Sequence, residues 1–553
     1  KQLARLAPEE RAALEAASVV GQAFSAAAVA AALGQAPETV DECCEDLADL
    51  GQLVEGAGSV EWPDGTVSGR YRFRHALYVD VLRDRIPPTR LARMHRLVAE
   101  RIEAAYGAAA REHAALLAAH FEAGGRREDA GRYHDLAGES ALRQSAHGVA
   151  LGHFRKALEL LGPERDRGHE LALHTKIGMS YAAARGYTAP EAERAFANAV
   201  ALSEGLEDRI ELFSAYRGLR EFFLVRGEIP QTRAFAEQLH RLATAHGDPL
   251  FMAEAQFSLG SVRFYAGELE AARAAFEVAL AAVSKAGAPA DAITYTHDPI
   301  ATTLSELALT LWQLGCPDEA RARSAEAVAA AETRVHPLGR AHAYSFDAIL
   351  QQSLDDVAAV RARAAAVRRI AVEHGFPHWL AMSCLLEGWT AVREGDPAAG
   401  VELLQTGIGA TEAIGARLGL AYWRVTLAQA LGAMGRRADG LAVVVAERER
   451  IERTGERGQA SQLHRVEGEL RLLGPDPREA DAEACFMRAI DVASRGGART
   501  YELAAALALA RLWRNLGRGR DARAMLERRL ATFTPGAVTP EITAATAFLA
   551  GAR

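Results

Sequence analysis

Residues 260–279, GSVRFYAGELEAARAAFEVA, decide the fold of this chain. Small residues and one large apolar residue recur there at fixed offsets: Gly260, Gly267, Ala272, Phe276 and Ala279. Two antiparallel helices can cross closely only where small residues stand at the contact. The stretch therefore predicts a pair of helices joined by a turn at Gly267, which is the plan of a tetratricopeptide-type unit.

The same pattern recurs in register along the chain. It is matched by Gly138, Ser145, Ala150, Phe154 and Ala157, by Ala308, Gly315, Ala320 and Ala327, and by Gly388, Gly395, Gly400, Leu404 and Gly407. Later units are marked by Gly435 with Gly440, by Ala482, Phe486 and Ala489, and by Ala510, Gly517, Ala522 and Leu526. The turn glycines Gly395 and Gly435 lie 40 residues apart, so the period exceeds the roughly 34 residues of the common unit. An irregular helical bundle would not repeat in this way.

The sequence therefore predicts an all-α fold, a TPR-type α-solenoid in a right-handed superhelix. We expect about ten helix pairs over residues 127–535, preceded by a helical linker or first hairpin over 89–126 and closed by a capping helix over 536–553. The segment from Gly287 to Ile293 is the longest interruption with the composition of a loop.

Composition limits the class of protein. The five cysteines are odd in number and show no CxxC pair, which favours a reducing, cytoplasmic location over export. No run of about 18 apolar residues is present, so no membrane association is expected. The net charge of -8 gives no general attraction to nucleic acid. Because the chain starts at a lysine without a signal-peptide pattern, we expect it to be part of a larger protein.

A solenoid exposes a concave face, and such faces commonly bind partners. The offsets that turn inward carry five aromatic residues: Phe257, Phe264, Trp312, Trp389 and Tyr422. They are candidates for binding a protein or a small-molecule effector, because aromatic side chains anchor ligands in grooves. The alternative is that they pack against neighbouring helices, as most Trp and Tyr side chains do.

The first 88 residues follow a different pattern. Helical segments at 8–17, 25–33 and 37–50 precede two alternating stretches at 53–57 and 70–73, which Trp62-Pro63-Asp64-Gly65 connects, and a helix at 76–83. Three helices, a β-hairpin and a closing helix predict a small winged-helix domain over residues 1–88.

Winged helices often bind DNA through their third helix. Here that helix, PETVDECCEDLADL, has six carboxylates and no Lys or Arg, so it would be repelled by a polyanion. DNA is therefore an improbable partner of this module. Arg70, Arg72 and Arg74 alternate on the second strand and should place three guanidinium groups on one face, where they can meet carboxylates or a nucleotide.

Several stretches together carry a resemblance to a known family. They are YRFRHAL at 71–77, His297-Asp298-Pro299, EHGFPHW at 373–379, and the segments at 456–465, 501–513 and 533–540. In their order along the chain they resemble the C-terminal part of bacterial signal-transducing ATPases of the STAND class. The chain looks most like the proteins that combine an adenylate/guanylate cyclase domain, an ATPase module and a TPR tail.

The resemblance implies an upstream ATPase domain that binds ADP or ATP, a winged helix that folds over this nucleotide, and a tail that senses an input. His75 occupies the place of a histidine that contacts the ADP phosphate in such switches, and Arg72 and Arg74 flank it. The chemistry is reasonable because an imidazole can donate to a phosphate oxygen. A purely local hydrogen-bonding role for His75 is the alternative.

The chain itself lacks the parts of an enzyme. It has no GxxxxGKS or GxxxxGKT loop to hold phosphates, no catalytic residue is proposed, and no cofactor is expected within it. His113 and His120 are seven residues apart with no HExxH motif, so no metal site is predicted. Cys43 and Cys44 lie in the acidic helix, which should raise their thiol pKa and reduce their reactivity.

The predicted function is a regulatory and sensor module of a STAND-type ATPase. In this view the solenoid binds an effector, and the winged helix controls the nucleotide switch in contact with the protein's own ATPase domain. One alternative is a TPR-containing transcription regulator in which the winged helix, or a domain outside these residues, binds DNA. A constitutive scaffold is a third possibility.

Overall fold

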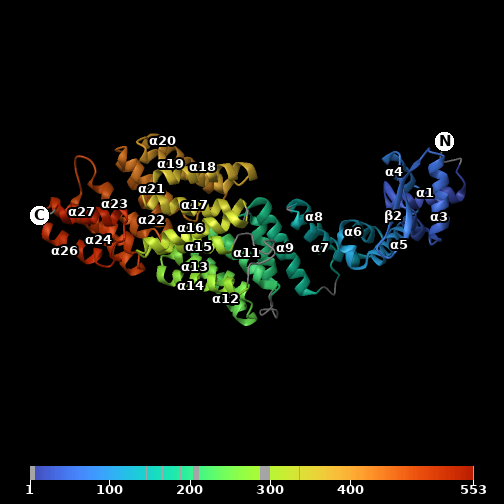
Figure 1. The fold of residues 1–553 in the computed structure, drawn as a ribbon, viewed down its shortest axis with the longest axis horizontal. Helices are drawn as coiled ribbons and strands as arrows, with labels where there is room; N and C mark the ends of the chain where they lie inside the picture. The colour runs from blue at the N-terminus through green and yellow to red at the C-terminus, as the bar shows by residue number, and fades with distance from the viewer. Residues whose placement is uncertain are drawn as a thin grey trace. The chain divides into compact units, whose positions relative to one another are not determined.

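The computed structural model describes residues 6–144, 146–162, 166–186, 188–203, 211–286, 299–334 and 337–551. The chain forms two compact units: the first comprises residues 1–185 and 198–204, the second residues 186–197 and 205–553 (Figure 1). The division near residue 185 falls within the range that the sequence predicts as one solenoid. Ser145, the loop at 287–293 and the pair His297-Asp298 lie outside the described residues.

The first unit begins with the predicted winged-helix arrangement. Its elements are α1 (Pro8–Val20), β1 (Ala23–Ser25), α2 (Ala26–Leu33), α3 (Pro37–Asp49), β2 (Val54–Glu61), β3 (Val67–Phe73) and α4 (Ala76–Arg83). The strands form an antiparallel sheet in the order β1-β3-β2. Because Phe24 of β1 packs on Tyr71 and Phe73 of β3, the short first strand is tied to the core.

Two details of the predicted hairpin were wrong. Both strands are longer than the stretches 53–57 and 70–73, and the three-residue strand β1 was not predicted. The register shifts between Gly56 and Ser59, so the second half of β2 loses the alternation by which a strand is recognised in sequence. On β3 the alternation holds: Tyr71 and Phe73 are buried, whereas Arg70, Arg72 and Arg74 are exposed on the other face, as predicted.

The rest of the first unit is helical. It comprises α5 (Pro88–Tyr106), the 3-10 helix η2 (Gly107–His113), α6 (Ala114–Ala123), α7 (Arg127–Arg143), α8 (His147–Leu160) and α9 (Arg167–Arg185). Consecutive helices pack on one another from α5 to α9.

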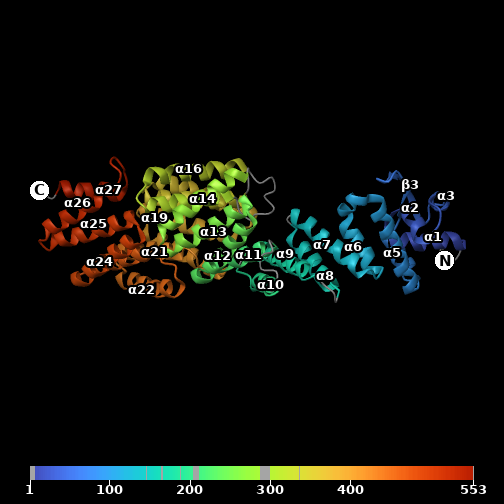
Figure 2. The ribbon, with the colours of Figure 1, turned by 90° about the horizontal axis from the view of Figure 1, so that it is seen from below.

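The second unit is a continuous series of antiparallel helices, and α10 (Pro190–Ala201) has residues in both units. The series comprises α11 (Glu211–Val225), α12 (Ile229–His246), α13 (Pro249–Ala266), α14 (Leu269–Ala286), α15 (Pro299–Gln313), α16 (Pro317–Arg334), α17 (Pro337–Ser353), α18 (Val357–His374), α19 (Pro377–Arg393), α20 (Pro397–Ala413), α21 (Leu420–Ala433), α22 (Arg437–Thr454), α23 (Ala460–Leu472), α24 (Glu479–Gly496), α25 (Arg499–Asn515), α26 (Gly519–Leu530) and α27 (Pro540–Ala550). Figure 2 shows α12, α13, α14 and α16 in successive positions across this unit. The predicted TPR-type α-solenoid is confirmed.

The small residues of the sequence pattern stand where helices touch. A Cβ atom on Gly260 of α13 would lie 2.5 Å from the ring of Phe276 on α14, and one on Gly138 of α7 would lie 2.4 Å from Phe154 on α8. Neither distance leaves room for a methyl group, because Phe276 and Phe154 are fully buried. The glycine of the first helix thus receives the large residue of the second, which explains the 16-residue spacing between them in both hairpins.

In the second unit, segments far apart in sequence also touch. The Thr500 hydroxyl at the start of α25 donates to the carbonyl oxygen of Trp312 in α15 (2.6 Å), 188 residues earlier. Arg321 of α16 donates to the Val538 carbonyl oxygen (3.0 Å), 217 residues later. The Gly458 amide donates to the Tyr265 carbonyl oxygen of α13 (2.9 Å). Successive turns of the superhelix are therefore in contact, and helices of one turn are covered by the next.

Candidate functional site

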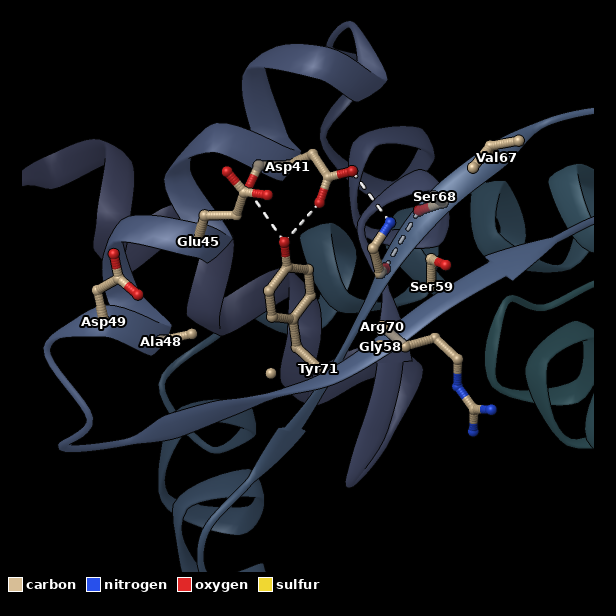
Figure 3. A pocket seen from close by; sticks show the side chains of 12 residues that line it. Asp41, Glu45, Ala48, Asp49, Gly58, Ser59, Val67, Ser68, Arg70 and Tyr71 are labelled. Carbon is tan, nitrogen blue, oxygen red and sulfur yellow. Dashed lines mark hydrogen bonds between the residues drawn. The ribbon is translucent and has the colours of Figure 1, made fainter.

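A groove of about 550 Å³ runs between α3 and the β2–β3 hairpin of the winged helix (Figure 3). Asp41, Glu45 and Asp49, at successive intervals of four residues on α3, line one wall, and β3 from Val67 to Tyr71 lines the other. Because residues four apart share a helix face, the three carboxylates form one acidic stripe along the groove.

Tyr71 and Asp41 join the two walls. The Tyr71 hydroxyl donates to Asp41 Oδ1 (2.6 Å), and the Gly69 amide donates to Asp41 Oδ2 (3.0 Å). Burial and the Asp41 carboxylate raise the pKa of Tyr71 far above its ordinary value, so the hydroxyl keeps its proton. These contacts lock α3 against the hairpin and fix the shape of the groove.

The charge on α3 is uncompensated within the described part of the chain. None of its carboxylates forms a salt bridge with a described Lys or Arg, and Glu45 and Asp49 are exposed. Arg70, on the opposite wall, is exposed and extends away from Asp41 in Figure 3. The face that DNA-binding winged helices present to the major groove is thus negatively charged here, as the sequence indicated.

The nucleotide-contact candidates lie at the other end of β3. Arg72 makes a salt bridge to Glu55 of β2 (2.5 Å), and Arg74 lies 3.7 Å from the same carboxylate. The hydrogen bond from Arg72 lowers the pKa of Glu55. His75 is exposed at the N-terminus of α4, with its ring 5.7 Å from that of Tyr78. The three candidates are close along the chain, and the two arginines share one carboxylate.

The five aromatic candidates of the solenoid divide into two groups. Phe257, Phe264 and Trp312 are 4%, 7% and 3% exposed and belong to the core around α13, α14 and α15, which leaves little surface for a partner. Trp389 and Tyr422 are only partly buried. The Tyr422 hydroxyl donates to Gln352 Oε1 of α17 (3.1 Å). Partner binding by these residues stays a prediction.

The thiols agree with the expectation of low reactivity. Cys43 and Cys44 are free, and Cys44 is buried in α3. Burial, with Cys43 and Asp41 nearby, raises the pKa of Cys44 to about 12, and burial also raises that of Cys43. Neither is a thiolate at neutral pH.

Sequence reasoning missed a group of buried charged residues in the second unit. Arg220 of α11 is 1% exposed and lies between Glu221 (2.8 Å) and Glu254 of α13 (3.3 Å), while Glu306 of α15 is 4% exposed. A single charged residue in a helix of Thr, Ser, Leu and Ala residues was a visible signal at Glu306. Its burial could not be predicted, because it depends on the adjacent superhelical turn.

Comparisons with known proteins do not assign the chain to a family. No family model matches it. An uncharacterised protein of Rhizobium meliloti (strain 1021) is 24% identical over 441 residues. The match covers 78% of this chain but 42% of that protein, so the chain spans less than half of its length.

Solved structures with a partly similar fold include a Rap protein, a quorum sensor and a STAND protein. A Rap protein complexed with Competence and Sporulation Factor has a TM-score of 0.46 at 12% identity, covering 70% of this chain and 100% of that one. The apo quorum sensor NprR of B. thuringiensis has a TM-score of 0.40 at 10% identity, covering 66% and 99%. A STAND protein with a tetratricopeptide repeat sensor from Pyrococcus horikoshii has a TM-score of 0.35 at 15% identity, covering 74% and 64%.

Proposed function

We propose that this chain is the regulatory and sensor part of a larger STAND-type signal-transduction ATPase. The solenoid binds a protein or small effector, and the winged helix controls the nucleotide switch. The observation that supports this most is the acidic helix α3, which has six carboxylates and no described cation paired with them. A winged helix with this charge is suited to a protein or intramolecular partner rather than to nucleic acid.

The nucleotide of such a switch, ADP or ATP, belongs to a domain outside these residues. The exposed end of β3 fits a phosphate group: His75, Arg72 and Arg74 present hydrogen-bond donors, and the arginine side chains are 58% and 47% exposed. In this proposal the three residues contact the phosphate of bound ADP. Because the two arginines share the single Glu55 carboxylate here, a phosphate group would compete with Glu55 for them.

The proposal assigns no catalytic step to this chain, and any ATPase or cyclase activity to the longer protein. A cytoplasmic location is part of the proposal, supported by five cysteines that are all free. Among the described residues, no helix combines the length and the apolar character needed to cross a membrane.

The test is His75→Ala in the full-length protein, with bound nucleotide measured by chromatography after purification and again after dialysis. We expect ADP to dissociate faster from this variant, because one donor to the phosphate is lost, on the order of tenfold for one charge-assisted hydrogen bond. His246→Ala is the matched control, since His246 is exposed at the end of α12 and far along the chain from the winged helix. Unchanged ADP retention in His75→Ala would contradict the assigned role.

The alternative function, transcription regulation through DNA binding, has a distinct signature. Fluorescence anisotropy of a labelled duplex at about 50 and 200 mM salt measures affinity and its salt dependence. We expect no binding at either concentration, because α3 is negatively charged. Tight binding that weakens steeply with salt would favour the alternative.

A further inference from the structure

Helix α15 is buried on every side and is nevertheless polar. Its sequence, PIATTLSELALTLWQ, contains several hydroxyl residues and Glu306, and every residue but Ile300 is buried. The helix packs against α13, α14, α16 and α17, and against α25 of the next superhelical turn. A helix in such a position is normally apolar all round. The polar side chains of α15 therefore require individual explanation.

Three of the hydroxyl groups are satisfied within the helix. Thr303, Ser305 and Thr310 donate to the carbonyl oxygens four residues earlier, at 2.6, 2.7 and 2.8 Å. Thr302 Oγ1 and Glu306 Oε2 are also buried but have no hydrogen-bond partner in the described part of the chain. An unsatisfied buried polar group costs about 1–3 kcal/mol, so these two atoms mark an incomplete environment.

The facing helix α13 contributes matching groups. Ser258 and Ser261 are fully buried, and neither hydroxyl has a hydrogen-bond partner among the residues described. The Ser261 hydroxyl is close enough to Glu306 to favour its ionised form, although no well-formed hydrogen bond joins them. The unsatisfied polar atoms of α13 and α15 thus include hydroxyl and carboxyl oxygens that can accept hydrogen bonds.

Among the residues that the structure describes, no cation forms a salt bridge with Glu306. Arg220 is the guanidinium whose charge acts on it, but Arg220 already contacts Glu221 and Glu254 and lies 5.4 Å from the centre of the Phe257 ring. Burial, the largest cause, and Glu221 raise the pKa of Glu306 to about 8 against the opposing effects of Ser261 and Arg220. At neutral pH the carboxyl group is therefore mostly protonated and lacks a counter-ion.

A polar rim lies beside this group. The Glu221 side chain is 27% exposed, and Tyr265 and His378 are partly buried. Burial and then the charges of Glu306, Glu456 and Glu221 raise the pKa of Tyr265 well above its ordinary value. Glu221 also acts on His378 of α19. Glu221, Tyr265 and His378 are therefore the partly exposed polar groups whose electrostatics are coupled to this region.

We propose that the interior of the second unit binds the ammonium group of an amine effector at Glu306, with the oxygens of Ser261 and Glu221 as further acceptors. This inference rests on the proposed sensor function and names the chemistry of its effector. An ammonium group is compact, carries three N–H donors and supplies the missing positive charge. A small polyamine and the lysine side chain of a peptide share this chemistry.

Binding should be coupled to proton release. When the ammonium group arrives, the Glu306 carboxyl group ionises and its proton passes to the buffer, so the charge of the site plus ligand stays balanced. The N–H donors then meet the oxygens that have no partner in the free protein. Effector binding at this point would join α11, α13 and α15, which are consecutive first helices of the repeat.

The test is isothermal titration calorimetry of this chain with spermidine, and separately with an N-acetylated, C-amidated tetralysine peptide, at pH 7 in phosphate and in MOPS, neither of which contains a primary ammonium group. We expect saturable binding of one or both amines with release of about one proton, seen as a difference in heat between the two buffers. The probe that binds more tightly identifies the source of the ammonium group. Tetramethylammonium, which has no N–H donor, should not bind.

Matched variants locate the site. Glu306→Gln preserves shape and should weaken amine binding at least about tenfold and abolish proton release. Glu277→Gln is the control, because Glu277 is 53% exposed on α14. Glu221→Gln alters the partly exposed rim and should weaken binding about threefold to tenfold, which keeps the test valid if Glu306→Gln does not fold.

Absence of binding by both amines at millimolar concentration would overturn the proposal, and so would unchanged affinity in Glu306→Gln and Glu221→Gln. Capture of an uncharged effector elsewhere on the solenoid would overturn the ammonium site but leave the sensor function intact. Conversely, Glu306-dependent amine binding that does not alter ADP retention by the full-length protein would support the site and contradict the sensor function.

Discussion

The hairpin α7–α8 of the first unit and the hairpin α13–α14 of the second use the same apolar contact but treat their polar groups differently. In both, a glycine receives a buried phenylalanine ring. In the first unit, His134 of α7 bonds His153 of α8 (2.9 Å) and Glu122 of α6 (3.1 Å), within 19 residues of sequence. In the second, the buried Thr500 hydroxyl bonds a carbonyl oxygen 188 residues away, and Ser258, Ser261 and Glu306 Oε2 have no hydrogen-bond partner among the described residues.

This difference separates buried polar groups that only stabilise the fold from buried polar groups that are available to a ligand. A buried polar group that is paired within its own hairpin needs no further hydrogen-bond partner. The histidine pairs of the first unit are of this kind. A buried polar group that has no partner, such as Glu306, reduces stability and points to a ligand or to ordered water. The repeat pattern forms both environments.

The largest expected effect tests what the two hairpins share. Gly260→Val and Gly138→Val each place a branched side chain where a Cβ atom alone would lie within 2.5 Å of a buried ring. Each should lower the free energy of unfolding of its unit by about 3 kcal/mol or more, because the ring cannot move aside. Urea denaturation with hydrogen exchange on the two hairpins measures the loss.

The matched control is Gly409→Val. Gly409 is a helical glycine of α20 at which a Cβ atom would meet nothing within 4 Å. Its effect should stay within about 0.5 kcal/mol, since Val and Gly differ little in helix propensity. Equal destabilisation by Gly409→Val and Gly260→Val would show that helix propensity, not close approach, accounts for the loss.

The next expected effect is a difference between the two units in how their stability depends on pH. Burial lowers the pKa of His95 and His120, which bond each other through their Nδ1 atoms (2.9 Å), to about 4, and the nearby Arg83 also lowers both. The folded state binds fewer protons than the unfolded state, so stability is present above about pH 6.5 and is lost as pH falls towards 4. Around His120 the loss from pH 7 to pH 5 should be about 2 kcal/mol.

Glu306 should respond in the opposite direction. Its raised pKa of about 8 means that the folded state binds the extra proton, so its contribution is present below about pH 4.5 and is lost as pH rises through 8. Hydrogen exchange at pH 5 and pH 7, corrected for intrinsic rates, should show α5 and α6 less protected at pH 5 and α15 more protected. His120→Gln should remove much of the first effect. Parallel responses in both units would contradict these assignments.

Whether a contact could be predicted from the sequence depends on how many residues separate its partners along the chain. The meeting of Gly260 with Phe276 is set by residues 16 apart in one hairpin, and its spacing is visible in the sequence. The exposure of Arg72 followed from strand alternation, whereas β1 is only three residues long and gave no such signal.

The site in α15 could be predicted only in part from the sequence. The sequence presents Glu306 among Thr, Leu and Ala residues, but a helix with a carboxylate normally exposes it. Its burial depends on α25, which packs on α15 only because the superhelix completes a turn. The curvature that brings them together is the sum of small rotations at each helix pair, which no local pattern specifies.

The smallest expected effect tests that contact between turns. Thr500→Val keeps the shape of a side chain that is 2% exposed but removes the hydrogen bond to the Trp312 carbonyl oxygen. The loss should be about 1 kcal/mol, at the lower end of the range for buried hydrogen bonds, because the same oxygen also accepts from the Gly315 amide. Hydrogen exchange should become faster in α15 and α25 and stay unchanged in α7 and α8.

Thr333→Val is the matched control for this change, since the exposed Thr333 hydroxyl bonds only its own helix at the Ala329 carbonyl oxygen. It should alter neither region. If Thr500→Val also leaves the protection of α15 unchanged, the adjacent turn does not hold that helix in place. The burial of Glu306 would then have to come from α13, α14, α16 and α17 alone, and the contrast between the two units would rest on local packing.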